Sequence, residues 1–136
     1  MEYQPFEYEV KILEKHLDTF GHMNNATYLE IYEEARWDFI TNNGFGLDKV
    51  QSLKIGPVIL ELHLTFKKEI KNREVIKIKS QLNEIKNPLI STLKQEMIND
   101  KGEVCSVLDL TVGLMDLEKR KLIQPTDEWK KAIGMV

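Results

Sequence analysis

The sequence is poor in cysteine and has no long hydrophobic run. Its 136 residues include one cysteine, Cys105, so no internal disulfide can form, which agrees with a reducing compartment. Val104 and Val107 beside it predict a buried strand thiol rather than a reactive one. No apolar stretch approaches the roughly 18 residues that a membrane-spanning helix needs, and the first residues lack the cationic, apolar character of a leader. These absences predict a soluble, cytoplasmic protein without membrane insertion.

The sequence also lacks a strong excess of positive or negative charge. The chain carries 19 basic and 22 acidic side chains, a net charge of −3 and a pI of about 5.7. Because general nucleic-acid binders derive most of their affinity from a basic surface, this composition argues against a nucleic-acid partner. The length fits a single domain, residues 1–136, which is large enough for its own core. Oligomerisation would still add much buried surface to a chain of this size.

Alternating apolar residues predict strands over most of the chain. Every second residue of Phe6–Ile12 is apolar, and Val58–Phe66 repeats this pattern so strongly that we expect one unbroken buried face. Gly113 indicates a bulge or a close backbone approach. Turn-forming residues separate three further strands, which short connections make antiparallel neighbours. These strands are Glu74–Glu84, Leu89–Ile98 and Glu103–Leu117.

A helical segment lies between the first strand and this meander. Its bulky residues recur at intervals of three, four or seven, and its other side is also largely apolar, so we predict four to five turns wrapped by the sheet. Asn24 or Asn25 can cap its start, and Gly44 can end it. Thr126 can cap a short amphipathic tail at about residues 126–136. The bulky residues of the stripe are Leu29, Tyr32, Phe39 and Ile40.

Residues with chemical potential gather immediately before this helix. Asp18, His22, Asn24 and Asn25 lie within eight positions of the chain. The first turn of a helix exposes up to four backbone N–H groups with a partial positive charge, which can polarise a carbonyl or bind an anion. On the residues alone, Asp18 fits a turn residue that binds its own backbone better than a catalytic acid. Capping likewise suits the two asparagines better than direct chemistry.

A longer motif adds to this interpretation. The segments His16-Leu-Asp18, His22-Met-Asn-Asn25-Ala-Thr-Tyr28-Leu and Glu33-Glu-Ala-Arg36-Trp37 resemble the hotdog-fold acyl-CoA thioesterases of the 4-hydroxybenzoyl-CoA thioesterase family. They are most similar to the bacterial long-chain acyl-CoA thioesterase III branch. The resemblance extends from about residue 10 to residue 117. It implies an α+β hotdog fold, in which a five-stranded antiparallel sheet wraps a long central helix.

The resemblance also implies an activity. Such an enzyme hydrolyses acyl-CoA to a free carboxylic acid and coenzyme A, with no cofactor or metal, and works as a homodimer or homotetramer. Asp18 occupies the position of the catalytic aspartate, which either attacks the thioester carbonyl or activates a water. The thioester oxygen would lie against the start of the helix, formed by Asn24, Asn25, Ala26 and Thr27.

Other residues are candidates for substrate contacts. Lys67, Lys68 and Arg73 would reach the phosphates of coenzyme A, or form a plain solvated rim. His22 and Tyr28 are further candidates near the helix start. Glu33 and Glu34 would form ion pairs with Arg36 or supply a second carboxylate. We expect the acyl pocket to be lined by Leu53, Ile55, Val58 and the loop Gly44–Gly46.

Two departures from related patterns narrow the reaction. Plant-type acyl-ACP thioesterases carry an asparagine two residues after the aspartate, where this chain has Phe20. Hotdog hydratases place four residues between their aspartate and histidine, whereas Asp18 and His22 have three between them. An acyl-CoA thioesterase is therefore the predicted function. The alternatives are an acyl-ACP thioesterase and a non-catalytic module that binds acyl-CoA or fatty acyl groups.

Overall fold

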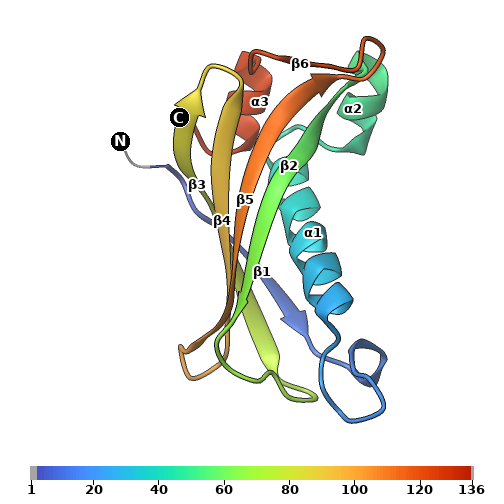
Figure 1. Ribbon diagram of the computed structural model, residues 1–136, viewed down its shortest axis with the longest axis vertical. Coiled ribbons are helices and arrows are strands. Elements are labelled where there is room, and N and C mark those ends of the chain that lie inside the picture. The colour runs from blue at the N-terminus through green and yellow to red at the C-terminus, as the bar shows by residue number, and fades with distance from the viewer. Residues whose placement is uncertain (1–2, 136) are drawn as a thin grey trace.

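One long helix lies against a strongly twisted antiparallel sheet (Figure 1). The computed structural model describes residues 3–135; the predicted domain of 1–136 and tail of 126–136 include residues 1, 2 and 136, which lie outside this description. The strand order is β1-β3-β4-β5-β2, with every pair antiparallel, and β6 adds to β5. The elements are β1 (Phe6–Lys11), a 3₁₀ turn (Glu14–His16), α1 (Asn25–Asn42), α2 (Leu47–Leu53), β2 (Ile55–Phe66), β3 (Val75–Asn87), β4 (Ile90–Ile98), β5 (Val104–Asp116), β6 (Lys121–Ile123) and α3 (Asp127–Ala132).

The α+β prediction is confirmed, with a long central helix against a five-strand path. The predicted five-stranded sheet gains a sixth strand, because the three residues of β6 pair with Leu114–Asp116 where β4 has already stopped. Gly113 lies at this crossing, and a Cβ there would come within 2.8 Å of the Leu122 side chain. A close approach, rather than a bulge in β5, therefore explains this glycine.

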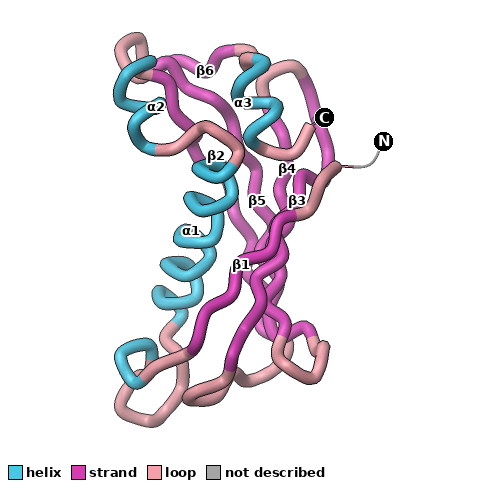
Figure 2. The backbone as a smooth tube through the Cα atoms, turned by 180° about the vertical axis from the view of Figure 1, so that it is seen from behind, coloured by secondary structure: helices cyan, strands magenta, loops and turns pink. Residues whose placement is uncertain are grey.

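Helix α1 begins and ends where capping residues allow it. Asn24 is its N-cap, and Phe45 N–H closes its end by donating to Ile40 O at 2.8 Å. Gly44 has φ +93°, a left-handed conformation that glycine adopts cheaply. The short helix α2 follows at once and was not predicted, since seven residues contain too few turns to show a period. Figure 2 shows α2 and α3 at one end of the molecule and the loop before α1 at the other.

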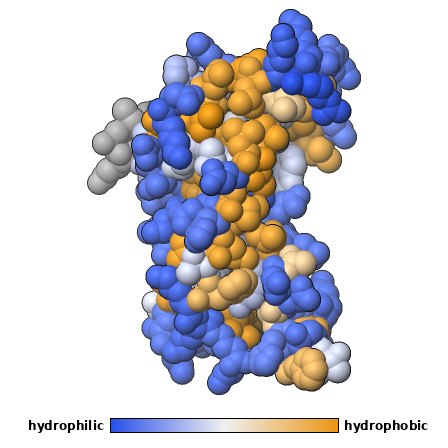
Figure 3. All heavy atoms as spheres, in the orientation of Figure 1, coloured by the Kyte–Doolittle hydropathy of each residue, from blue (hydrophilic) through white to orange (hydrophobic). Residues whose placement is uncertain are grey.

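The predicted buried face of β2 is wrong in two respects. A bulge between Ile59 and Glu61 leaves Leu60 without a partner, so Val58 points away from α1 while Leu62 and Phe66 point toward it. Strand β2 is also the last in the path, so several of its apolar side chains remain exposed. Leu62 is 43% exposed and Phe66 54% exposed. Figure 3 shows the resulting band of apolar surface along the molecule.

A buried polar network joins α1 to the middle of the sheet. The Gln95 amide donates to Tyr32 O at 3.1 Å and to Ser80 Oγ at 2.9 Å, and it accepts a bond from Arg36 at 3.0 Å. The Tyr32 hydroxyl bonds to Ser106 Oγ. Ser80, Gln95 and Ser106 are buried, so these bonds hold the helix in one register on an otherwise apolar surface.

The opposite face of the sheet is polar. Glu7 lies opposite Lys79 and Glu9 opposite Lys77, so side chains of opposite charge face each other across β1 and β3. On the α1 side of β1, Phe6 stacks on Phe39 with ring centroids 5.3 Å apart. Within residues 3–135, no helix is long and apolar enough to cross a membrane.

The contact of Tyr8 with Glu34 predicts a pH effect. The Tyr8 hydroxyl donates to the Glu34 carboxylate, and this bond with some burial raises the pKa of Tyr8 to about 12. Because the folded-state pKa lies above the unfolded value, the contact stabilises the fold below about pH 10 and is lost as the pH rises through about 12. Phenolate absorbance should show a transition near pH 12 that Tyr8→Phe removes. If the transition that this variant removes were centred near pH 10, the contact would be absent in solution.

Candidate active site

The loop before α1, residues 17–23, is held in a tight turn by backbone hydrogen bonds around Asp18. Leu17 and Met23 form an antiparallel bridge, and Asp18 N–H donates to His22 O at 2.8 Å. Gly21 N–H donates back to Asp18 O at 3.0 Å, with Gly21 at φ +82°. The left-handed conformation at this point needs glycine. The loop therefore brings Asp18 back beside the residues that begin the helix.

The carboxylate of Asp18 is oriented by the same loop. Its Oδ1 accepts hydrogen bonds from Phe20 N–H at 2.9 Å and from His22 N–H at 3.0 Å. Within residues 3–135, Oδ2 has no hydrogen-bond partner, and the side chain is exposed. The turn role predicted for Asp18 is thus confirmed for one oxygen. The other oxygen is fixed in direction and accessible to a ligand.

The start of α1 presents backbone N–H groups next to this carboxylate loop. Asn24, rather than Asn25, is the cap: its Oδ1 accepts a bond from Ala26 N–H at 2.8 Å, and Tyr28 N–H donates to Asn24 O. In the part of the chain described here, the N–H groups of Asn25 and Thr27 have no acceptor. They are the positive end of an 18-residue helix.

The loop between β2 and β3 lies against the Asp18 loop. His22 Nε2 is 3.3 Å from Glu69 Oε1, and both side chains are more than half exposed. Arg73 Nε donates to Glu14 Oε2 at 2.8 Å. That hydrogen bond is the main cause that lowers the pKa of Glu14 to about 2. Sequence reasoning missed Glu14 and Glu69, because ion pairs between residues so far apart in the chain leave no periodic signal.

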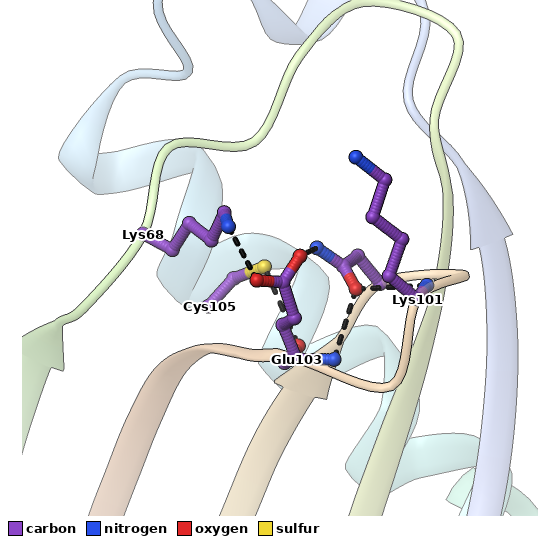
Figure 4. Close-up of polar contacts among 5 residues, drawn as sticks. Lys68, Lys101, Glu103 and Cys105 are labelled. Carbon is purple, nitrogen blue, oxygen red and sulfur yellow. Dashed lines mark hydrogen bonds and ion pairs between the residues drawn. The ribbon is translucent and has the colours of Figure 1, made fainter.

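Lys68 also has a carboxylate partner, as Figure 4 shows. Its ammonium pairs with Glu103, whose other oxygen accepts a bond from the Asn99 amide at 3.1 Å. Cys105 lies beneath this cluster and is buried, which confirms the predicted strand thiol; burial raises its pKa and so makes the thiolate scarce. Lys67, by contrast, is exposed and has no side-chain partner within residues 3–135.

Tyr28 belongs to the core rather than to the surface. It is 6% exposed, and its ring meets Phe66 edge-on with centroids 4.9 Å apart. Burial raises the pKa of its hydroxyl. The structure therefore brings Asp18, His22 and the helix start together, whereas Tyr28 packs in the core against Phe66.

An apolar cavity of about 180 Å³ lies farther along α1. The predicted lining, Leu53, Ile55, Val58 and the loop Gly44–Gly46, takes no part in this cavity. The predicted ion pairs of Glu33 and Glu34 with Arg36 are likewise absent from the described residues, because Glu34 binds Tyr8 and Arg36 binds Gln95. The cavity is lined by Glu33, Arg36, Trp37, Phe39, Ile40, Pro57, Ile59, Leu93, Val112, Trp129 and Ile133.

The similarity to known proteins extends over nearly the whole chain. Residues 13–133 match the Thioesterase-like superfamily. The chain is 27% identical, over 126 residues, to the long-chain acyl-CoA thioesterase FadM of Escherichia coli K12, which covers 92% of this chain and 94% of that protein.

Two solved structures of similar shape come from Escherichia coli and Staphylococcus aureus. YbaW, a probable thioesterase from Escherichia coli, is 26% identical with a TM-score of 0.82, over 95% of this chain and 96% of its own. The Staphylococcus aureus protein SAV2348, solved in complex with CoA, shares the fold with a TM-score of 0.88 at 18% identity, over 98% of this chain and 84% of its own. On the family match over residues 13–133, the chain belongs to the Thioesterase-like superfamily, and its fold is the hotdog fold.

Proposed function

We propose that this thioesterase hydrolyses acyl-CoA to a free carboxylic acid and coenzyme A, with Asp18 as the catalytic carboxylate. One observation carries the proposal. Asp18 Oδ1 accepts hydrogen bonds from two backbone N–H groups, while Oδ2 has no hydrogen-bond partner within residues 3–135. It lies beside the start of α1, where the N–H groups of Asn25 and Thr27 have no acceptor in that same range. The 27% identity to a long-chain acyl-CoA thioesterase over nearly the whole chain supports the substrate class. The proposed reaction uses no cofactor or metal, and coenzyme A counts as part of the substrate.

The first turn of α1 would stabilise the developing negative charge. The thioester oxygen accepts hydrogen bonds from the N–H groups of Asn25 and Thr27, within the positive end of the helix dipole. One such donor is worth about 3 to 4 kcal/mol in comparable acyl-transfer sites. Asn24 contributes by keeping its cap on Ala26, which holds this turn open for the substrate.

Two routes are compatible with an oriented carboxylate. In the first, Asp18 Oδ2 attacks the carbonyl carbon, coenzyme A leaves as the thiolate, and water then hydrolyses the acyl-aspartyl anhydride. In the second, Asp18 takes a proton from a water that attacks the carbonyl directly. A single turnover in ¹⁸O-water tests the first route, because attack of water on the aspartyl carbon of the anhydride puts the label in Asp18. Attack on the acyl carbon of the anhydride and direct attack on the thioester both put the label in the product. Label in Asp18 would therefore establish the covalent route.

A thiol-release assay over a panel of acyl-CoA esters tests the function. We expect turnover on at least one member of the panel, and acyl-ACP with the same acyl group should react more slowly. Saturable acyl-CoA binding without thiol release would instead support the non-catalytic binding module. Faster reaction with acyl-ACP would support the acyl-ACP thioesterase.

Contacts to the rest of coenzyme A are part of the proposal. Lys67 is the most available cation for a phosphate, while Lys68 and Arg73 would have to exchange their carboxylate partners for it. His22 is exposed at the same end of the molecule and would contact the substrate from beside Asp18.

We also propose a homodimer in which two copies of β2 meet. The outer edge of β2 has no neighbouring strand within residues 3–135, so its N–H and C=O groups lack ladder partners. The same strand exposes Ile59, Leu60, Leu62 and Phe66. A second copy would cover both features, and the polar outer face of the sheet favours a dimer over a stack of sheets.

Replacing Leu62 with lysine should disrupt this dimer. The substitution places a charge in the centre of the proposed interface, where desolvating it without a partner costs several kcal/mol. Sedimentation velocity should show a shift from dimer to monomer for Leu62→Lys. The control is Val75→Lys, which places lysine at another exposed apolar position, on β3. A wild-type chain that sediments as a monomer, or a Leu62→Lys variant that stays dimeric, would contradict the interface.

A further inference from the structure

The cavity on α1 is built from one stripe of the helix and closed at its far end by α3. Glu33, Arg36, Trp37 and Ile40 follow the spacing that places residues on one side of a helix. The sheet supplies the facing wall with Pro57, Ile59, Leu93 and Val112, and the C-terminal end is closed by Trp129 and Ile133. The two charged residues of the lining, Glu33 and Arg36, lie at the end of the cavity nearest the start of α1. The rest of the lining is apolar.

The same stripe leads back to the candidate active site. Ala26 and Leu29 continue it toward the start of α1, three to four residues apart. Beyond the bulge, Leu62 and Phe66 on β2 face the same side of the sheet as the cavity residue Ile59. An apolar track between α1 and β2 therefore connects the helix start with the cavity, and it belongs to the exposed band in Figure 3.

The length of this track limits the acyl groups that reach the cavity. With a rise of about 1.5 Å per residue, Glu33 lies about 9 Å and Ile40 about 20 Å along the helix from Thr27. An acyl group whose carbonyl is bound at the helix start must therefore extend about 9 Å before it enters the cavity. Short acyl groups such as acetyl end before this point.

We propose that the cavity receives the distal end of the acyl group and that Trp129 is the residue that limits its length. This inference rests on the proposed function. The cavity of about 180 Å³ is comparable to an engineered apolar cavity of about 150 Å³ that binds benzene. It therefore accommodates the end of an alkyl chain or an aryl group, and the substrate class is an elongated acyl group with an apolar terminus.

Trp129 is held firmly enough to act as the end wall. It is 3% exposed, and its ring meets the buried Phe45 edge-on at 5.3 Å. Its backbone N–H donates to Thr126 Oγ1 at 3.2 Å, which caps α3. Because Phe45 fills the space behind it, the indole cannot move away to admit a longer chain.

Two substitutions should change the preferred length in opposite directions. Trp129→Leu removes part of the end wall, and Ile133→Phe fills the cavity. Because one methylene in an apolar pocket changes kcat/KM about tenfold or more, Trp129→Leu should raise the ratio of longer to shorter acyl-CoA by about tenfold. Ile133→Phe should lower this ratio by about as much. The panel contains straight-chain and aryl acyl-CoA esters, which separates the two kinds of terminus.

Lys131→Leu, on the exposed side of α3, is the matched control and should leave the length profile unchanged. Circular dichroism and thermal unfolding identify variants that fail to fold. Trp129→Phe is a milder variant should Trp129→Leu prove unfolded. Folded Trp129 and Ile133 variants that keep the wild-type length profile would overturn the role of Trp129.

A binding measurement tests the cavity without catalysis. The chain has two tryptophans, Trp37 and Trp129, and both line the cavity. A fatty acid with a nitroxide at its far end should quench their fluorescence, whereas one labelled next to the carboxyl group should quench much less. Equal quenching by both probes, or none, would overturn the inference. Selective quenching by a protein that hydrolyses no acyl-CoA would sustain the cavity while refuting the proposed function.

Discussion

Replacing Asp18 with asparagine is expected to lower the kcat of thioester hydrolysis about 100-fold or more, which is the scale of a lost catalytic carboxylate. Asparagine keeps an oxygen that can accept the bonds from Phe20 and His22, so the loop is retained. The negative charge and the second carboxylate oxygen are lost. Steady-state thiol release with the best acyl-CoA substrate measures the effect.

Two comparisons make the Asp18 result specific. Asp100→Asn changes an exposed acid in the turn between β4 and β5 and should leave kcat unchanged. Asp18→Ala also removes the acceptor for the two backbone N–H groups, so it should lower the unfolding temperature as well as kcat. Wild-type turnover by a folded Asp18→Asn protein would rule out the catalytic role.

Replacing Gln95 with leucine is expected to destabilise the protein by about 2 to 4 kcal/mol, because several buried polar groups lose a partner at once. Arg36 loses its bond to the amide oxygen, and Ser80 Oγ and Tyr32 O lose their donor. Burial also lowers the pKa of the Arg36 guanidinium. Denaturant unfolding followed by circular dichroism measures the loss.

Gln124→Leu is the matched control, since Gln124 is exposed near β6 and its replacement should change stability by less than about 0.5 kcal/mol. If the network acts as one unit, Gln95→Leu combined with Arg36→Met should cost less than the sum of the two single changes. Strict additivity, or a Gln95→Leu protein as stable as the wild type, would show that the network contributes little.

Local regularities explain why most elements could be predicted. The alternation in Phe6–Ile12 reports a half-buried strand directly, and the structure has β1 at Phe6–Lys11. The caps at Asn24 and Thr126 were equally visible, because a cap depends on the residue itself and its nearest neighbours. Helix α2 was missed because its seven residues are too few to establish a period.

The orientation of β2 could not be predicted in this way, because it depends on pairing between distant strands. The alternation from Val58 to Phe66 is unbroken in the sequence, yet the bulge at Leu60 reverses which residues face α1. The position of β2 at the edge of the sheet depends on the order of all the strands. Neither property has a local cause, so neither leaves a local signal.

The helix, the strands and Asp18 beside a capped helix start could be read from the chain directly, because each depends on residues that are close together in the sequence. The partners that complete the region around Asp18 depend instead on how distant segments pack. Glu69 pairs with His22, and Glu14 pairs with Arg73. Residues of α1, three strands and the C-terminal segment, far apart in the sequence, line one cavity. These contacts arise when packing brings distant segments together, and packing depends on the shape of the whole chain.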